Sequence, residues 1–511
     1  MTLDISRPDL CIAVVGTGVM GRGIAQIAAQ AGIRTFLFDS RPGAATEAKQ
    51  SVATQWQRLA EKGRMTADAV QAATDRLEVA SALADLAPCH AVIEAIVEIL
   101  DAKRALFAEL EAIVTPTCIL ASNTSSLQVT AIAAKCKHPE RVAGYHFFNP
   151  VPLMKVVEVV GGLMTAPWVC DALASLSSRC GHKPVRAKDT PGFIVNHAGR
   201  GYGTEALRIA GEGITDYYDI DRVLRDAAGF RMGPFELFDL TGLDVSHPVM
   251  ESIYHQYFEE PRYTPSTITA QRLSAGVFGR KSAGRGFYVY PEGKLALPPG
   301  VEPEEAAPAV RPVHVWISAL GFGPKVRELA LKLGAVLDHG SVPSGGALCV
   351  VAPIGQDATT AALAENLDPS RTVAIDGLLS LSKRRTLMTT PVTRPEMRAA
   401  AHGLFASDGV PVTVIHDSPG FIAQRVLAHI VNVACDIAQQ RIATTADIDA
   451  AVTLGLGYPQ GPLAWGDALG AGNVLSILDA MQDFYRDPRY RASPWLKRRA
   501  LLGVSLSSPE S

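Results

Sequence analysis

The sequence predicts an α/β protein with a doubly wound, mostly parallel sheet, followed by an all-helical domain and by a degenerate second copy of both. Three observations carry this prediction. Residues 10–39 contain a strand, a glycine turn, a helix and a second strand. Apolar strands and helices go on alternating up to residue 160, and several motifs of the first half recur in the second. The chain has 511 residues, of which 48% are hydrophobic, so it can fill about three domain cores.

The composition excludes several classes of function. The N-terminus, MTLDISRPDLCIAVVG, lacks the basic and apolar regions of a signal peptide, and no apolar run approaches the roughly 18 residues of a membrane-spanning helix. The 8 cysteines form no CxxC pair and no His/Cys cluster at metal-ligand spacing, which predicts reduced thiols and no metal. A net charge of -3 with dispersed basic residues gives no footprint for nucleic acid or anionic lipid. We expect a cytoplasmic protein with a small-molecule ligand.

The segment 10–39 has the form of a dinucleotide-binding unit. It reads LCIAVVGTGVMGRGIAQIAAQAGIRTFLFD, so Gly16, Gly18 and Gly21 form a GxGxxG motif directly after a strand and at the start of a helix. An ordinary glycine turn is the alternative interpretation. Asp39 follows the second strand, where a carboxylate accepts hydrogen bonds from the adenosine ribose and repels a 2′-phosphate. This Rossmann-type unit therefore predicts NAD rather than NADP, although Arg41 lies close by in the sequence.

Polar residues follow the later strands at the points where these strands end. The strands are expected within residues 90–98, 117–127 and 141–148. Ligands of doubly wound sheets bind outside the carboxyl ends of the strands, so these polar residues are expected to converge. Taken singly, each also has a structural explanation as a turn residue, a helix cap or a solvated helix start. The residues are Glu94, Glu98, Asn123, Ser125 and His146.

His146 and Glu158 lie symmetrically about Pro152 in the stretch HFFNPVPLMKVVE. His146 ends one strand and Glu158 lies in the next, so a returning chain brings the two side chains together. A carboxylate bonded to one ring nitrogen fixes the tautomer, leaves the other nitrogen free to take a proton, and stabilises the imidazolium. Oxidation of an alcohol by NAD needs such a base. A packed core histidine is the alternative interpretation of His146.

Asn196 follows a Pro-Gly turn and lies in the first turns of the helix that begins the next domain. Its structural explanation is a capping or exposed asparagine. Its functional interpretation is a donor to the substrate oxygen, where it would work with Ser125 as negative charge develops.

Through these residues the chain closely resembles the 3-hydroxyacyl-CoA dehydrogenase family. The resemblance covers residues 10–290 and includes the motifs GTGVMGRGIAQ, VIEAIVE, ASNTSSL, GYHFFNPVPLMKVVEVV, KDTPGFIVN, AGFRMGPFELFDLTGLD and GRKSAGRGFY. It implies oxidation of an (S)-3-hydroxyacyl-CoA to the 3-oxoacyl-CoA with NAD. It also implies that His146 is the general base and that Glu158 orients it. Ser125 and Asn196 are the implied contacts to the substrate oxygen.

The same resemblance implies a set of cofactor and CoA contacts. Lys103 and Ser125 are implied to lie near the CoA thioester arm as well as the cofactor. Lys62 is a candidate contact to a CoA phosphate, with an exposed surface lysine as the alternative. The implied cofactor positions are Gly16, Gly18, Met20, Gly21, Asp39, Glu98, Lys103, Asn123, Ser125, Asn149 and Lys281.

Two features depart from the family pattern. GRKSAGRGFY, which contains Lys281, is one residue longer than the common GKKTGEGFY form. The helix after Asn196 carries Gly199, Gly201 and Gly203, although glycine lowers helix stability by about 1 kcal/mol relative to alanine. These glycines make room either for a ligand or for a close neighbouring helix.

The second half repeats the first after a proline-rich spacer with six prolines, which is interpreted as a linker. Beyond it, DTPGFIVN, EGITDYYDID and GFRMGPFELFDLTG recur as DSPGFIAQ, QRIATTADID and GYPQGPLAWGDALG, each 228 positions later. The predicted domains are an NAD-binding Rossmann domain (1–188), a helical dehydrogenase C-terminal domain (189–290), the linker (291–312), a vestigial Rossmann-like segment (313–414) and a second helical domain (415–511).

The second copy lacks the residues that the chemistry needs. Gly321 and Gly323 are interpreted as the first two glycines of the motif, with Val326 in place of the third. The stretch RTVAIDGLLSLSKRRTL has no counterpart of the His/Glu pair, and Gln424 stands where the first copy has Asn196. We therefore expect a catalytically inactive copy. Short members of the family pair through their helical domains, so residues 415–490 are expected to act as an internal pseudo-dimer partner; a homo-oligomer of the whole chain is the second possibility.

The resemblance also favours a substrate. This long form is similar to family members that act on 3-hydroxyadipyl-CoA in phenylacetate breakdown, and that substrate has a free terminal carboxylate. Arg200, one helical turn after Asn196, is interpreted as its partner, with an arginine that snorkels from the helix as the alternative.

Three different functions compete with this one. The first is a dehydrogenase of 3-hydroxybutyryl-CoA or of general fatty-acid β-oxidation. The second is a dehydrogenase of free 3-hydroxy acids that uses a lysine base, and the third is a non-catalytic crystallin-like relative. The intact His/Glu pair argues against the second and the third.

Overall fold

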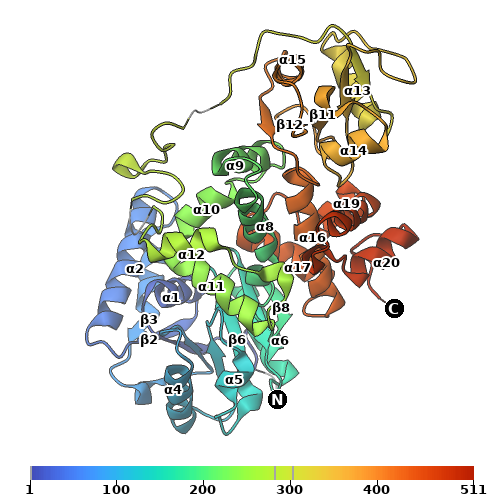
Figure 1. The fold of residues 1–511 in the computed structure, drawn as a ribbon. Helices are drawn as coiled ribbons and strands as arrows, with labels where there is room; N and C mark the ends of the chain where they lie inside the picture. The colour runs from blue at the N-terminus through green and yellow to red at the C-terminus, as the bar shows by residue number, and fades with distance from the viewer. Residues whose placement is uncertain (1–2, 281–283, 302–303, 511) are drawn as a thin grey trace. The chain divides into compact units, whose positions relative to one another are not determined.

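The structure is a computed structural model that describes residues 3–280, 284–301 and 304–510 (Figure 1). Lys281 lies outside the described residues. The chain divides into two compact units. Unit 1 contains Met1–His197 and Gln440–Leu456, and unit 2 contains Ala198–Gln439 and Gly457–Ser511. A short segment from the second half of the chain is therefore part of the first unit.

Unit 1 is built on an eight-stranded sheet in the order β3-β2-β1-β4-β5-β6-β7-β8. Among the described strands of this sheet, β6 and β7 pair antiparallel and the other neighbours are parallel. The inner strands are buried throughout, as expected for a sheet covered by helices on both faces. The predicted doubly wound fold is confirmed. The strands are β1 (Cys11–Val15), β2 (Arg34–Phe38), β3 (Leu77–Val79), β4 (Ala91–Glu94), β5 (Ile119–Ser122), β6 (Val142–Phe147), β7 (Val156–Gly161) and β8 (Lys183–Lys188).

Helices and short 3-10 turns connect these strands. Two glycines allow the first helix to lie close to the sheet: a β-carbon at Gly21 would lie 1.8 Å from the Gly16 carbonyl oxygen, and Gly16 itself has a φ of +92°. The helical elements of unit 1 are α1 (Val19–Gln30), α2 (Ala44–Glu61), α3 (Ala67–Asp75), η1 (Leu83–Leu86), α4 (Leu100–Ile113), α5 (Val129–Ala133), η2 (Pro139–Arg141), α6 (Pro167–Arg179), α7 (Val195–Ala198) and α17 (Thr445–Leu456).

Unit 2 contains the helical sets of both copies apart from α7 and α17. The first set is α8 (Arg200–Gly211), α9 (Tyr217–Asp226), α10 (Pro234–Thr241), α11 (Leu243–Gln256), η3 (Pro261–Tyr263) and α12 (Thr267–Ser274). The second set is α16 (Ala423–Gln439), α18 (Pro462–Leu469), α19 (Ala471–Tyr485), η6 (Pro488–Tyr490) and α20 (Pro494–Leu502).

A smaller sheet in unit 2 is the shortened second copy of the first. Its order is β13-β12-β11-β10-β9, and β11 pairs antiparallel with β12. This order corresponds to β8-β7-β6-β5-β1. A parallel bridge, Val315 with Leu337, replaces β2. The elements are β9 (Val315–Ile317), α13 (Gly323–Lys332), β10 (Leu348–Val351), α14 (Ala358–Ala364), η5 (Pro369–Arg371), β11 (Thr372–Ile375), β12 (Arg385–Thr389), α15 (Pro395–Phe405) and β13 (Val412–Ile415).

Structural details support this correspondence. Asp189 accepts hydrogen bonds from the Val129 and Thr130 N–H groups at 2.8 and 2.6 Å, at the start of α5. Asp417 accepts from the Ala358 N–H at 2.7 Å, at the start of α14. In both copies, an aspartate that follows the last strand of the sheet therefore accepts hydrogen bonds from the first N–H groups of the equivalent helix.

The glycine turn of the second copy shares features with two positions of the first. A β-carbon at Gly323 would lie 1.9 Å from the Ser318 carbonyl oxygen, much as one at Gly21 would lie 1.8 Å from the Gly16 carbonyl oxygen. Gly321 in turn resembles Gly16: both have a positive φ, and a β-carbon at either would lie within 2.6 Å of the carbonyl oxygen that follows the neighbouring strand. The assignment of Gly321 and Gly323 as the first two glycines, with Val326 in place of the third, stays a prediction.

The end of the proline-rich spacer is anchored to the second α/β segment. Glu305 forms a forked ion pair with Arg398 of α15, with both contacts at 2.7 Å, and Glu304 pairs with the buried Arg384. A β-carbon at Gly403 would lie 2.5 Å from the Pro308 carbonyl oxygen. Within the described part of the chain, no helix is both long and apolar enough to cross a membrane.

Candidate active site

The turn after β1 forms a cradle suited to a dinucleotide. The Gly16 N–H donates to the Phe38 carbonyl at 2.8 Å, which joins β1 to β2 at their carboxyl ends. Gly18 is the N-cap of α1, and a β-carbon there would meet no described atom within 4 Å. No side chain among the described residues caps this helix, so its first N–H groups are available to an anion. These residues fit the pyrophosphate of NAD.

Asp39 is held as an ionised acceptor at the end of β2. Its Oδ2 accepts from the Thr17 N–H at 2.7 Å and from the Thr17 hydroxyl at 2.8 Å, and its Oδ1 accepts from the Arg41 N–H at 2.9 Å. Partial burial opposes ionisation, but these hydrogen bonds outweigh it and lower the pKa of Asp39. The Arg41 side chain turns to Glu47, 2.8 Å away, so the cation that weakened the prediction of NAD is engaged elsewhere.

Lys103 is the centre of an ion cluster at the end of β4, where it contacts Glu94 and Glu98. Its Nζ lies 2.6 Å from Glu94 Oε1 and 3.2 Å from Glu98 Oε2, and the side chain is only 1% exposed. The Ser122 hydroxyl donates to the other oxygen of Glu94 at 2.7 Å. Lys103 therefore contacts carboxylates of the protein rather than an open ligand surface. The sequence signal for this role was the acidic pair four residues apart, VIEAIVE.

Glu98 holds the loop that carries Ser125. Its Oε1 accepts from the Thr124 hydroxyl at 2.6 Å, from the Ser125 N–H at 2.9 Å and from the Ser126 N–H at 3.1 Å. Burial opposes the charge on Glu98, but Lys103 and these donors lower its pKa. The Ser125 hydroxyl is half-buried and has no hydrogen-bond partner among the described residues. It is therefore available to a substrate oxygen.

Asn123 joins two neighbouring strand ends. Its Oδ1 accepts from the Phe147 N–H at 2.9 Å, and its own N–H donates to the Glu94 carbonyl at 2.8 Å. Asn149 is exposed in the turn after β6, and Met20 is half-buried in the first turn of α1.

His146 and Glu158 face each other across the antiparallel pair β6 and β7. His146 Nδ1 lies 2.6 Å from Glu158 Oε2. The histidine is 5% exposed and the glutamate is fully buried. An ionised carboxylate accepts the Nδ1 proton, which leaves Nε2 as the unprotonated nitrogen. The structure thus brings together the two side chains that the spacing about Pro152 predicted to meet.

Glu158 has a second function that the sequence did not reveal. Its Oε1 accepts from the Ile194 and Val195 N–H groups at 2.8 and 2.9 Å. These groups begin α7, the helix that carries Asn196, so one carboxylate holds both the histidine and the asparagine helix. Glu158 and Ile194 are 36 positions apart, and no local pattern marks the contact.

The remaining predicted residues occupy different surroundings. Lys62 is exposed at the C-terminus of α2 in unit 1. Arg200 is half-buried at the first residue of α8 in unit 2. The glycines of α8 admit close neighbours: a β-carbon at Gly201 would lie 3.0 Å from Ile430 Cα, and one at Gly203 would lie 2.7 Å from the Phe238 ring. Both glycines are therefore explained by packing.

The arrangement defines a class of protein. A dinucleotide cradle, an acidic acceptor for its ribose and a His/Glu pair at one sheet edge are the parts of an NAD-dependent dehydrogenase that removes hydride and a proton from an alcohol. Within the described ranges, no group of three or more His, Cys, Asp or Glu residues is arranged to hold a metal ion.

Comparisons with known proteins specify this class. Residues 11–190 match the NAD-binding domain of 3-hydroxyacyl-CoA dehydrogenases, and residues 192–290 and 420–505 match the C-terminal domain of the same enzymes. The chain is 37% identical to the 3-hydroxyadipyl-CoA dehydrogenase of Escherichia coli K12 over 491 residues, 96% of this chain and 97% of that protein. It is 40% identical to a probable 3-hydroxybutyryl-CoA dehydrogenase of Bacillus subtilis over 281 residues, 55% of this chain and 97% of the relative.

A solved structure covers the same extent. The crystal structure of 3-hydroxybutyryl-CoA dehydrogenase from Escherichia coli K12 matches with a TM-score of 0.84 and 35% identity, over 96% of this chain and 98% of that one. The chain belongs to the 3-hydroxyacyl-CoA dehydrogenase family, as its motifs implied. It is an NAD-dependent enzyme.

Proposed function

We propose that oxidation of the 3-hydroxyacyl-CoA takes place at His146, Glu158, Ser125 and Asn196. The observation that carries this proposal is the buried His146–Glu158 pair at the carboxyl edge of the sheet. NAD supplies the hydride acceptor. As hydride leaves C3 and the C3–O double bond forms, His146 Nε2 takes the hydroxyl proton. Glu158 stabilises the resulting imidazolium.

Ser125 and Asn196 act on the oxygen. In the reverse direction the 3-oxo oxygen becomes an alkoxide as hydride arrives, and donors aimed at it lower the energy of that charge. The unengaged Ser125 hydroxyl supports this role for Ser125. The hydrogen bonds from Glu98 to the 124–126 loop keep the hydroxyl in place.

Reduction of acetoacetyl-CoA, followed by loss of NADH, tests this function. We expect steady turnover with the thioester and none with free acetoacetate. A dehydrogenase of free 3-hydroxy acids would show the opposite preference, and a crystallin-like relative would turn over neither.

We propose 3-hydroxyadipyl-CoA as the substrate. The support is the 37% identity over almost the whole chain to a 3-hydroxyadipyl-CoA dehydrogenase. A solved structure of the same extent is described as a 3-hydroxybutyryl-CoA dehydrogenase, so 3-hydroxybutyryl-CoA is the substrate to compare with it. Comparison of kcat/KM for 3-hydroxyadipyl-CoA, 3-hydroxybutyryl-CoA and longer unbranched substrates tests this choice. A preference for any uncharged acyl chain would contradict it.

Arg200 is our proposed partner of the distal carboxylate. Burial lowers its pKa to about 10, so the guanidinium is still charged at neutral pH, and its forked geometry suits a carboxylate. Arg200→Ala should reduce kcat/KM for 3-hydroxyadipyl-CoA far more than for 3-hydroxybutyryl-CoA. Equal losses on both substrates would end this assignment.

We also propose that the second helical set replaces a partner subunit. Two equivalent hydrogen bonds support this idea. The Lys188 N–H of the first copy donates to the Ile442 carbonyl of the second at 2.9 Å in unit 1. The His416 N–H of the second copy donates to the Ile214 carbonyl of the first at 3.0 Å in unit 2. His416 and Ile442 lie 228 positions after Lys188 and Ile214, and such an exchange of roles characterises a two-fold interface.

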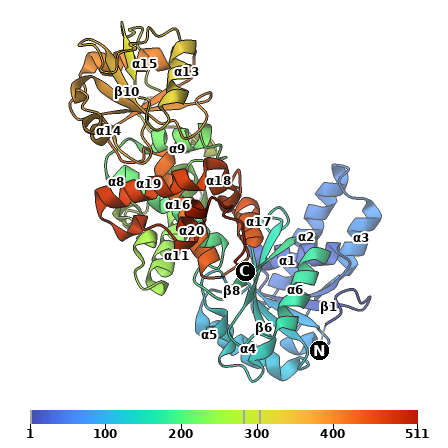
Figure 2. The ribbon, with the colours of Figure 1, turned by 90° about the vertical axis from the view of Figure 1, so that its right-hand side faces the viewer.

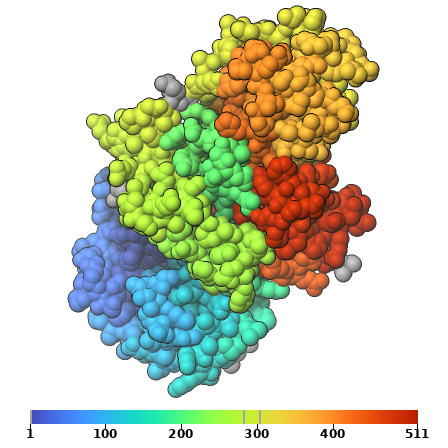
Figure 3. Space-filling view, viewed as in Figure 1, coloured from blue at the N-terminus to red at the C-terminus, as the bar shows by residue number. Residues whose placement is uncertain are grey.

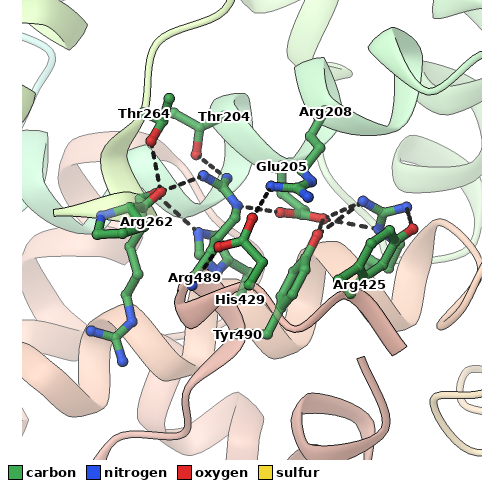
Figure 4. A network of polar contacts seen from close by, with 12 residues as sticks. Thr204, Glu205, Arg208, Arg262, Thr264, Arg425, His429, Arg489 and Tyr490 are labelled. Atoms are coloured by element: carbon green, nitrogen blue, oxygen red, sulfur yellow. Dashed lines mark hydrogen bonds and ion pairs between the residues drawn. The ribbon is translucent and has the colours of Figure 1, made fainter. Parts of the chain in front are cut away.

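The contact between α8 and α16 supports the same proposal. The two helices pack against each other, and in Figure 3 green atoms of the first helical set border red atoms of the second. Glu205 of α8 is fully buried and accepts from Arg425 Nε at 2.9 Å, Arg489 Nε at 2.8 Å and the Tyr490 hydroxyl at 2.9 Å (Figure 4). Burial alone would raise the pKa of Glu205, but Arg425 and Arg489 hold it well below its ordinary value.

A reciprocal ion pair completes this interface. The motif Pro-Arg-Tyr occurs once in each copy, at η3 and η6. Arg489 of the second copy pairs with Glu205 of the first, and Arg262 of the first copy pairs with Asp436 of the second at 2.6 Å. Each copy therefore gives an arginine to an acid of the other.

A cut linker tests the internal pairing. A protease site inserted after Gly300 would separate the covalent halves, and we expect them to co-elute after cleavage. Glu205→Ala should weaken this association, because removal of one partner from a buried ion pair costs about 3–5 kcal/mol. Glu328→Ala, at the exposed pair with Lys332, is the control. Halves of the wild-type chain that separate after cleavage would contradict the proposal.

A further inference from the structure

Helix α17 belongs to the second copy in sequence but to the first unit in space. It packs against β7 and β8, and Figure 2 shows it beside the sheet near β8. Its approach is fixed at the Lys188–Ile442 hydrogen bond and at Asp447, whose Oδ2 lies 3.5 Å from the Arg186 N–H. A helix of the second copy therefore covers β8, the edge strand, and β7, the strand that carries Glu158.

Gly455 of α17 approaches the residue before Asn196. A β-carbon at Gly455 would lie 3.0 and 3.2 Å from the two methyl carbons of Val195, and 3.5 Å from Val156 Cγ1. Val195 and Val156 are buried at 1% and 0% exposure. The Val195 side chain therefore rests directly on the backbone of α17.

Val195 is also held from the opposite direction. Its N–H donates to Glu158 Oε1, the oxygen that does not contact His146. The preceding Phe193 has a φ of +48°, and its ring lies 5.9 Å from the His146 ring. A non-glycine residue in this region costs on the order of 1–3 kcal/mol, so it persists only where its surroundings fix it.

We propose that Gly455 is a positioning residue for the dehydrogenase reaction. Because Gly455 has no side chain, Val195 can pack against its backbone, and this contact fixes the position of α7 and Asn196. The Ile194 and Val195 N–H groups bond to Glu158, so the same contact also fixes the orientation of the His146 ring. The inference rests on the proposed roles of His146, Glu158 and Asn196. The second copy would then contribute to catalysis without supplying a reacting group, because its helix α17 helps to orient His146, Glu158 and Asn196.

The test uses the full-length enzyme with Gly455→Ala. Alanine favours the helix, but its methyl group must move Val195 by a few tenths of an ångström. Since misplacement of about 1 Å can cost roughly 100-fold in rate, we expect kcat to fall about 5- to 10-fold. NADH affinity should stay unchanged, because the Gly16–Asp39 cradle is untouched. The acid limb of the kcat/KM pH profile should move, because the Glu158–His146 contact changes.

Two further variants make the result specific. Val195→Ala removes the methyl groups that a β-carbon at position 455 would meet, so it should restore most of kcat when combined with Gly455→Ala. Gly472→Ala in α19 is the matched control, since a β-carbon there meets no described atom within 4 Å and kcat should not change.

The outcomes separate this inference from the proposed function. A wild-type enzyme without acyl-CoA turnover would refute the proposed function, and the inference with it. An active wild type whose Gly455→Ala and Gly455→Val variants keep kcat within 2-fold would refute the inference alone. The inference would also fail if Gly455→Ala lowered NADH affinity as much as kcat, or if Val195→Ala gave no recovery.

Discussion

The first and second copies differ most where β6 faces β7 and β11 faces β12. In the first copy, His146 lies opposite Glu158. In the second, β11 and β12 keep the same antiparallel pairing, and Asp376 and Thr386 fall at the equivalent places. Ser125, the third residue after β5, corresponds to Ile354, the third residue after β10. Gln424 stands at the place of Asn196. The second copy therefore keeps the fold without any of the four side chains that we propose for the reaction.

In the second copy, polar groups of the protein bond to one another at the place that corresponds to the proposed site. Gln424 is fully buried, accepts from the Gly355 N–H at 2.8 Å, and donates to Asp376 Oδ1 at 3.0 Å and the Pro353 carbonyl at 3.2 Å. Each of these polar groups is satisfied within the protein. Among the described residues of the first copy, the Ser125 hydroxyl and His146 Nε2 have no hydrogen-bond partner, which agrees with the proposal that they contact a substrate.

Glu158→Gln should cause the largest loss of activity among these variants while the first copy stays folded. The amide keeps an acceptor for the Ile194 and Val195 N–H groups, so the fold should remain. Its NH₂ group donates to His146 Nδ1, which moves the ring proton to Nε2 and removes the base. We expect kcat to fall roughly 10²- to 10⁴-fold, with circular dichroism unchanged. The equivalent change in the second copy, Thr386→Val, should leave kcat as it is. Near-wild-type turnover of Glu158→Gln would return His146 to a core role.

Asp39→Asn should give a smaller effect, confined to the cofactor. Loss of a charged acceptor costs about 1.5–3 kcal/mol, so the Kd for NADH should rise by about 10-fold or more while that for NADPH changes little. Fluorescence titration measures both constants. Asp338→Asn is the control, because Asp338 accepts backbone hydrogen bonds beside β9 in the second copy. Weaker NADH binding by Asp338→Asn would indicate a second nucleotide site.

Asp376→Asn should change stability but not activity. Burial raises the pKa of Asp376 from 3.8, although Gln424 and the Leu378 N–H donate to it. A raised pKa in the folded state means that the folded chain binds this proton more tightly than the unfolded chain. The contribution to stability is full below 3.8 and is lost as pH rises through the folded-state pKa. Asparagine removes this loss, so the variant should gain stability relative to wild type as pH rises from 3.8 through the raised folded-state pKa of Asp376.

Urea unfolding at several pH values measures that gain. The amide oxygen of the introduced asparagine would keep an acceptor for Gln424, so a large loss of stability at low pH is not expected. A stability difference that stays constant with pH would show that Asp376 is not protonated more readily in the folded chain.

The sequence predicted the parts of the site that lie on consecutive strands. GxGxxG between a strand and a helix located the cradle, and the placement of His146 and Glu158 about Pro152 predicted their contact. The contact of Gly455 with Val195 was out of reach, because 260 positions separate the two residues and a glycine near a helix end has many explanations. The alignment of Gly321 and Gly323 with the first glycine motif stays a prediction, because spacing alone does not distinguish a packing glycine from a phosphate-binding one.

The central claim is that the first copy alone carries the chemistry, while the second contributes packing. The most direct measurement is kcat/KM for acetoacetyl-CoA reduction by His146→Gln and Asp376→Asn in the full chain. We predict a loss of about 10³-fold for the first, as expected when a general base is removed, and a change of less than 2-fold for the second. Comparable losses in both variants, or wild-type activity in His146→Gln, would contradict the claim.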